Sequence, residues 1–134
     1  MATNSKHPKY AELLPDWELC RDSYRGERAV KERGTIHLPA TAGMIADGAQ
    51  TVNTTGWHAY QAYLARAVFH EYYAMAVETM LGLLWAKPPV IELPGQMEDM
   101  LERITPDGNS IEQLLRTINE HQLVVGRLGL LLDL

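Results

Sequence analysis

Cysteine is almost absent from this sequence, because Cys20 is the only one. A single cysteine excludes a framework of internal disulfide bonds, and its side chain is expected to act as a small buried hydrophobe. The N-terminus also lacks the charged and then apolar pattern of a signal segment. We therefore expect a chain that folds in a cytosol.

Positive charge is scarce as well, since 12 Lys and Arg residues stand against 17 Asp and Glu residues and give a formal net charge of −5. This sign disfavours a protein that binds duplex DNA tightly by releasing counterions. A long hydrophobic run without charge is also missing. Arg66, His70, Glu71 and Glu78 interrupt the longest apolar stretch, residues 57–86, so a transmembrane helix is not expected.

What remains is an ordinary globular composition, with 46% hydrophobic and 22% charged residues in a chain of 134. This length is enough for one domain with a single core. Residues 1–34 are a first helix region, in which apolar residues at helical spacing follow Pro8 and Gly34 ends the helix. Residues 35–56, rich in Gly, Ala and Thr, predict a long loop in which only "TIHLP" resembles a strand.

The second half of the chain predicts further helices and short strands. Residues 57–86 predict one long helix, with Thr54 or Thr55 as its N-cap and "KPP" as its stop. Residues 87–134 predict, in order, a short strand at "VIEL", a helix over 97–104, a helix over 111–121 with Ser110 as its N-cap, and the start of a terminal strand. The chain closes on "VVGRLGLLLDL", which needs a sheet to cover it. We expect a mainly α fold with long helices and short β segments, incomplete alone, as the front part of a longer protein.

No motif in the sequence demands catalysis. "HEYY" at residues 70–73 resembles a zinc-protease helix, but Ala74 stands where that motif needs its second histidine. "DGNSIE" starts like a calcium loop and lacks the later ligands, so a turn before a capped helix explains it. The basic stretch "RDSYRGERAVKER" has acids at helical spacing from its cations, which favours a solvated face over a phosphate or nucleic-acid patch. We expect no catalytic residue, no cofactor and no metal.

Three stretches, taken together, resemble the N-terminal region of tailed-bacteriophage portal proteins. They are "HPKYAELLPDWELCRDSYRGERAVKERGTIHLP", "YQAYLARAVFHEYYAMAVETMLGLLWAKPPVIEL" and "DGNSIEQLLRTINEHQLVVGRLGLLLDL". In order they supply a Trp-x(4)-Asp-x(3)-Gly-Glu-x(2)-Val-Lys-x(2)-Gly-x(3)-Leu-Pro run, a Tyr-x(2)-Arg-Ala-x-Phe helix and a Gly-Arg-x-Gly-x(3)-Asp segment. The resemblance covers nearly the whole chain except the first few residues and the loop around 40–56.

The resemblance implies a wing-region segment of a homo-oligomeric ring of about twelve subunits at one capsid vertex, the head-to-tail connector. DNA would pass through its channel without sequence specificity during packaging and ejection, while terminase, capsid proteins and head-completion or tail proteins dock on it. The protein would assemble in the bacterial cytoplasm and reside in the virion, away from any membrane. Candidate structural or intersubunit residues are Trp17, Asp22, Glu27, Lys31, Tyr63, Arg66, Phe69 and Arg127.

Two other functions are compatible with the same sequence. A stand-alone helical adaptor would bind a partner protein through the apolar stripe of residues 57–86. A small helical enzyme or metalloprotein would use His70, Glu71, Glu78 and His121. Absence of a ring would favour the adaptor, and stoichiometric bound iron or zinc would favour the metalloprotein.

Overall fold

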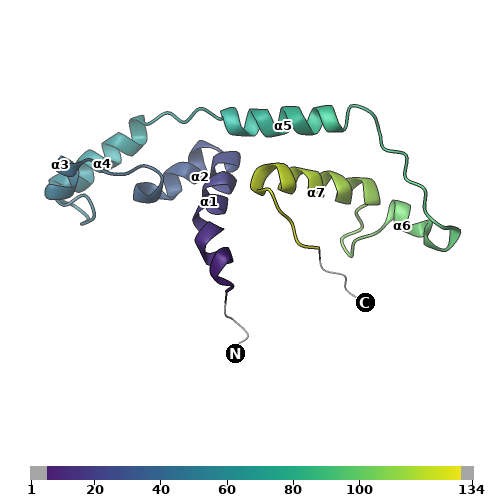
Figure 1. Cartoon of the computed structure of the whole chain (residues 1–134). Coiled ribbons are helices and arrows are strands. Elements are labelled where there is room, and N and C mark those ends of the chain that lie inside the picture. The colour runs from purple at the N-terminus through teal and green to yellow at the C-terminus, as the bar shows by residue number, and fades with distance from the viewer. Residues whose placement is uncertain (1–5, 131–134) are drawn as a thin grey trace. The chain divides into compact units, whose positions relative to one another are not determined.

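The computed structural model describes residues 6–130, and within them the chain is helical and contains no β-strand (Figure 1). The expectation of a mainly α fold is therefore confirmed at this level. The short strands expected at "TIHLP" and "VIEL" are not formed: residues 34–36 are a 3-10 turn, and residues 90–93 have no regular structure. The expected terminal strand falls partly on residues 131–134, which lie outside the described part.

The chain divides into two compact units, one of residues 1–74 and the other of residues 75–134. The close helix packings are between consecutive helices within each unit. The first unit holds α1 (Pro8–Arg25), α2 (Glu27–Glu32), η1 (Gly34–Ile36), α3 (Ala42–Ala46), α4 (Thr55–Arg66) and the start of α5 (Tyr72–Leu84). The second holds the rest of α5 together with η2 (Gly95–Met97), α6 (Asp99–Glu102) and α7 (Ile111–Val125).

The first helix region is two helices, because the backbone turns at Gly26. This residue has φ of +91° and ψ of −168°, a conformation that side-chain-bearing residues rarely adopt. α1 ends at Arg25, and α2 runs from Glu27 and packs on α1. Gly34, with φ of +54°, follows the C-cap of α2, as the sequence predicted for the end of this region.

Residues 35–56 are not an open loop, because they contain α3 and a tight connection to α4. The Thr41 hydroxyl accepts from the Met44 N–H at 3.4 Å and caps α3. Gly56, in the first turn of α4, lies so close to α3 that a Cβ there would stand 2.6 Å from the Asp47 carbonyl carbon and 2.7 Å from the Ala49 nitrogen. Composition suggested a loop because Gly and Thr are weak helix formers, whereas here glycine allows close packing.

The long helix expected over residues 57–86 is broken into α4 and α5 by the irregular residues 67–71. Thr54 is the N-cap of α4, as expected, and its Oγ1 accepts from the Trp57 N–H at 3.1 Å. The break begins at Ala67, whose ψ of 131° is extended. Nothing in the local sequence signals it, because no proline or glycine lies there; Glu71 instead makes a contact with a distant segment, described below.

α7 follows the sequence expectation most closely. The Ser110 Oγ accepts from the Gln113 N–H at 3.3 Å, while the Gln113 side chain accepts from the Ser110 N–H at 3.1 Å, which completes a capping box. The helix extends past the expected residue 121 to Val125 and ends on Gly126, with φ of +78°. The helix expected at 97–104 is confined to η2 and the single turn of α6.

We expect the substitution Ser110→Ala to destabilise α7 by about 1 kcal/mol, because it removes a side-chain acceptor from the unpaired first turn. Thr117→Ala, in the middle of the same helix, is the matched control. The Thr117 hydroxyl only donates to the Gln113 carbonyl within the helix, so alanine should leave the helix as stable or slightly more stable. Urea unfolding followed by far-UV circular dichroism measures both, and equal effects of the two substitutions would contradict the capping role.

Few side chains in the described chain are fully enclosed. The buried hydrophobic residues are Trp17, Val30, Ala49 and Tyr60 in the first unit, and Val77, Leu81 and Val124 in the second. No helix within residues 6–130 has the length and apolar character needed to cross a membrane.

Candidate functional site

One charged residue, Asp22, is buried among the described residues, with 4% of its surface exposed. Its Oδ2 accepts from Arg33 Nε at 2.7 Å and lies 3.0 Å from His37 Nε2. Because an ionised carboxylate only accepts hydrogen bonds, the imidazole N–H donates here. Arg33 also reaches Glu18, with Nη2 at 3.4 Å from Oε2. We call Glu18, Asp22, Arg33 and His37 the Asp22 cluster.

The folded backbone brings the Asp22 cluster together. Glu18 and Asp22 are four residues apart on α1 and therefore share one face of this helix. The turn at Gly26 brings α2 back along α1, so that Arg33 at the end of α2 and His37 after η1 return to that face. The arrangement fastens residues 33–37 to α1.

The environment of Asp22 sets its protonation. Burial raises the pKa of this carboxyl, but hydrogen bonds from His37 and Arg33, together with their charges, outweigh burial and hold the pKa below its ordinary value of 3.8. Asp22 is therefore an anion at neutral pH. A carboxylate whose partners favour its charged form stabilises the fold only while it stays ionised.

This shift predicts a loss of stability in acid. The contribution of Asp22 is complete above the unfolded pKa and disappears as the pH falls through the lower pKa of the folded protein. We expect the free energy of unfolding of the native protein to fall over this interval, and that of Asp22→Asn to fall less. Urea unfolding at a series of pH values between neutral and strongly acid measures the difference. Parallel curves for the two proteins would contradict the assigned role.

The second part of the site surrounds Gly26, in the α1–α2 turn itself. The Glu71 Oε1 accepts from the Glu27 N–H at 3.3 Å and lies where a Cβ on Gly26 would stand. Glu27 pairs with Lys31 four residues later on α2, and this hydrogen bond from Lys31 holds the pKa of the Glu27 carboxyl below its ordinary value. The backbone N–H of Phe69 also donates to this carboxylate. Residues 69–71 are thereby attached to the start of α2.

The candidate residues therefore fall into three groups. Asp22 belongs to the Asp22 cluster, and Glu27, Lys31 and Phe69 lie together at the start of α2. Trp17 is buried on α1, where its ring contacts Tyr10 edge to face with centroids 5.1 Å apart. Tyr63, Arg66 and Arg127 lie elsewhere: Tyr63 lies 6.1 Å from Tyr60 between ring centroids, Arg66 donates to the Ala62 carbonyl of its own helix, and Arg127 is exposed after α7.

Four contributors were not predicted as site residues: Glu18, Arg33, His37 and Tyr60. Glu71 was named only among the residues of the alternative metalloprotein. The Tyr60 hydroxyl donates to the Leu38 carbonyl at 2.9 Å, and burial raises the pKa of this phenol. Arg33 lay within the basic stretch, but its partner Asp22 is 11 residues away, beyond any helical spacing. Cys20 also differs from expectation, since it is only half-buried and hydrogen-bonded to Tyr73.

Two further basic residues of this stretch, Arg28 and Lys31, form ion pairs within α2. Arg28 pairs with Glu32 at 2.8 Å, and Lys31 pairs with Glu27, both at the spacing of one helical turn. These four side chains line a shallow hollow on α2. The pairing at helical spacing that the sequence predicts is therefore confirmed for Glu27 and Glu32, whereas Asp22 pairs with Arg33, 11 residues away.

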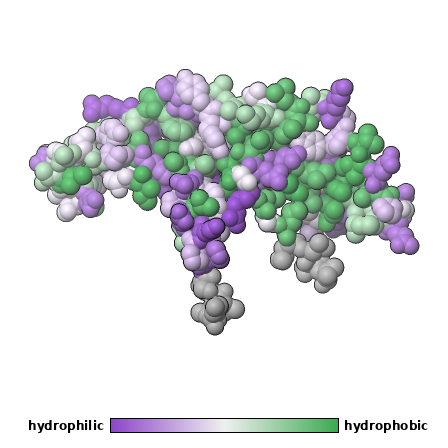
Figure 2. Space-filling model, viewed as in Figure 1, coloured by the Kyte–Doolittle hydropathy of each residue, from purple (hydrophilic) through white to green (hydrophobic). Residues whose placement is uncertain are grey.

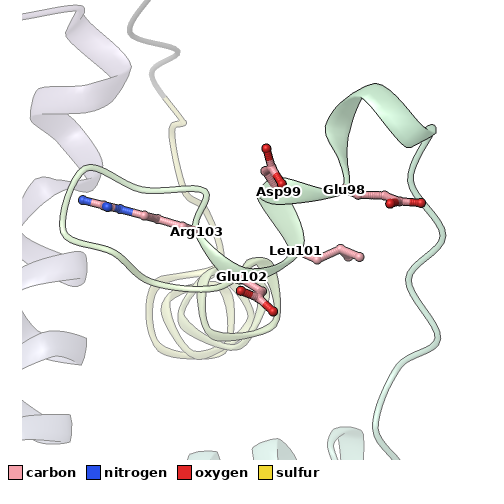
Figure 3. A pocket seen from close by; sticks show the side chains of 5 residues that line it. All are labelled: Glu98, Asp99, Leu101, Glu102 and Arg103. Carbon is pink, nitrogen blue, oxygen red and sulfur yellow. The ribbon is translucent and has the colours of Figure 1, made fainter.

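A second hollow lies around α6 and is lined by Glu98, Asp99, Leu101, Glu102 and Arg103 (Figure 3). Figure 3 shows that the three carboxylates point in different directions and do not converge on a common point. Within residues 6–130, no three His, Cys, Asp or Glu side chains form a group able to hold a metal ion. His70, Glu71, Glu78 and His121 thus do not form such a group.

Comparison of the chain with protein-family models, with curated proteins and with solved structures gave no match.

Proposed function

We propose that this chain is the N-terminal, wing-region segment of a bacteriophage portal subunit and acts structurally, without catalysis. In this function the subunits form a ring at the capsid vertex through which DNA enters and leaves. Terminase, capsid proteins and head-completion or tail proteins would dock on the ring, and the protein would reside in the virion. The proposal rests on the sequence resemblance and on the part that the resembling residues play in the fold.

The observation that carries the proposal is that the first portal-like motif coincides with the α1–α2 turn. Its Trp, Asp and Val positions are the buried residues Trp17, Asp22 and Val30. Its two glycines are Gly26 and Gly34, both at positive φ. A motif made of buried and turn-forming residues is typical of a structural element, because catalytic motifs place reactive groups where a substrate can reach them. This supports a role in architecture.

The negative charge of the chain also supports a role as a channel for DNA. The chain carries a formal net charge of −5, and a wall of the same sign as DNA lets the polymer slide instead of adhering to it. The paired cations of α2 are consistent with this role, since their charges are already neutralised by Glu27 and Glu32. DNA would accordingly be a passing molecule without sequence-specific contacts.

Native mass spectrometry of the protein translated from its complete reading frame tests the proposal. We expect a closed ring of about a dozen copies. Arg66→Ala should weaken the ring without changing subunit stability, because Arg66 is exposed and donates only to its own helix. Arg116→Ala, on the exposed face of α7, serves as the matched control. A stable monomer or dimer of the complete product would contradict the portal function.

The stand-alone adaptor remains a second candidate because α5 exposes many large apolar side chains. Met75, Met80, Leu83 and Leu84 are all exposed, Leu83 to 73%. Figure 2 shows hydrophobic side chains, in green, at the surface along α5 and α7. Exposed apolar groups in such density are typical of interaction surfaces. An adaptor would give no ring, and Leu83→Glu would abolish its partner binding while leaving the helical circular dichroism unchanged.

A further inference from the structure

The first unit contains two helix pairs that are each tightly packed. α1 packs on α2, and α3 packs on α4 (Figure 1). Two segments of chain flank the α3–α4 pair: residues 33–41, which include η1, run from α2 to α3, and residues 67–71 run from α4 to α5. Each connecting segment is fastened to the α1–α2 pair by a carboxylate, and the two fastenings are described in turn.

The first connecting segment is held at both ends. Asp22 on α1 holds Arg33 and His37, and the His37 side chain is only 8% exposed. Further along, the Leu38 carbonyl accepts from the hydroxyl of Tyr60 on α4 at 2.9 Å. The segment therefore bridges one buried carboxylate on α1 and one buried phenol on α4.

The second connecting segment is held at the start of α2. Glu71 accepts from the Glu27 N–H, and the Phe69 N–H donates to the Glu27 carboxylate. Gly26 leaves room for the Glu71 carboxylate, because any Cβ there would collide with it. These contacts are few and polar, and segments held in this way open more easily than a packed core.

The α3–α4 pair itself is closely packed. Its close approach at Gly56 leaves no room for a methyl group, and the Gly56 N–H donates to the Asp47 carbonyl at 3.0 Å. The Thr54 hydroxyl donates toward two carbonyls, those of Gly48 at 2.6 Å and Thr51 at 2.8 Å. Motion between the helix pairs should therefore take place in the connecting segments and not inside the pair.

We propose that the α3–α4 pair moves as one body about two hinges, residues 33–41 and 67–71, and that Asp22 and Glu71 restrict this motion by fastening the hinges to the α1–α2 pair. Hinges of this kind are a few residues at element ends that absorb the backbone change. The motion follows from contacts within the chain, and it holds for the portal and the adaptor alike.

Amide hydrogen exchange measured residue by residue by NMR tests the proposal. In Asp22→Asn we expect exchange at His37 and Leu38, whose N–H groups donate to the Gly34 carbonyl, to become about tenfold faster. Exchange at the Glu27 N–H, which donates to Glu71 of the other hinge, should rise with it. The Ala49 and Gly56 amides, which bond inside the α3–α4 pair, should keep their protection. Glu32→Gln removes an acid from α2 without touching either hinge and should change none of these amides.

Two milder variants keep the test decisive if Asp22→Asn does not fold. Tyr60→Phe removes only the hydroxyl that holds Leu38, and Glu71→Ala removes only the second fastening. Each should speed exchange in the hinges alone. If protection at Ala49 and Gly56 falls equally, the pair unfolds instead of swinging, and the proposal is overturned. Unchanged exchange in both hinges would overturn it as well.

Discussion

Replacing Gly56 with alanine is expected to destabilise the first unit by about 3 kcal/mol. The added methyl group would stand within 2.6–2.7 Å of the Asp47 carbonyl carbon and the Ala49 nitrogen. Both are backbone atoms, so no side chain can rotate away, and α3 must separate from α4. Alanine is otherwise a better helix former than glycine by about 1 kcal/mol. The collision must therefore be what makes the change in folding free energy unfavourable.

Gly82 provides the matched control, because it also lies inside a helix but has nothing within 4 Å of an added Cβ. Gly82→Ala should stabilise α5 by about 1 kcal/mol. Urea unfolding, followed by far-UV circular dichroism and by tryptophan fluorescence, measures both variants. If Gly56→Ala were neutral or stabilising, the close packing of α3 on α4 would be wrong.

Asp22→Ala is expected to cost about 2–3 kcal/mol of folding free energy. The substitution leaves the buried His37 ring without its acceptor and removes one of the two acids that Arg33 contacts. The cost is below that of a fully buried pair because the Arg33 side chain is 38% exposed and keeps Glu18. Loss of a buried acceptor is costly because the remaining donors stay desolvated.

Glu32→Ala tests whether burial makes the difference, since Glu32 forms an ion pair with Arg28 that is exposed on both sides. Solvent screens such a pair, and its removal should change the unfolding curve little. Comparable losses for Asp22→Ala and Glu32→Ala would show that the Asp22 cluster contributes no more than a surface ion pair.

The sequence predicted those helix boundaries that local chemistry determines. Ser110, Thr54 and Gly34 each indicate a helix boundary through their own chemistry. A hydroxyl can cap the start of a helix, and glycine can adopt positive φ at its end. The mainly α fold followed from apolar spacing in the same way. The turn at Gly26, in contrast, was not among the predicted helix boundaries.

The sequence did not predict what depends on distant partners. Residues 67–71 contain no helix breaker, yet the helix stops there, and Glu71 binds an N–H 44 residues away. The Asp22 cluster was likewise predicted only in part. Asp22 was a candidate residue, whereas His37, 15 residues later, was not. Composition indicated a loop at residues 35–56 because it cannot distinguish flexible glycine from closely packed glycine such as Gly56.

The Glu71 carboxylate at Gly26 also affects the order in which the chain can fold. α2 has six residues and a glycine N-cap, so no side chain of its own satisfies its first N–H groups. Its acceptor, Glu71, is made 44 residues later, after all of α4. A helix this short is unstable alone, because the conformational entropy lost in forming the first turn exceeds the free energy gained from its few hydrogen bonds. During synthesis α2 should therefore stay unformed until α4 has left the ribosome, whereas α7, which carries its own caps, can form as soon as it emerges.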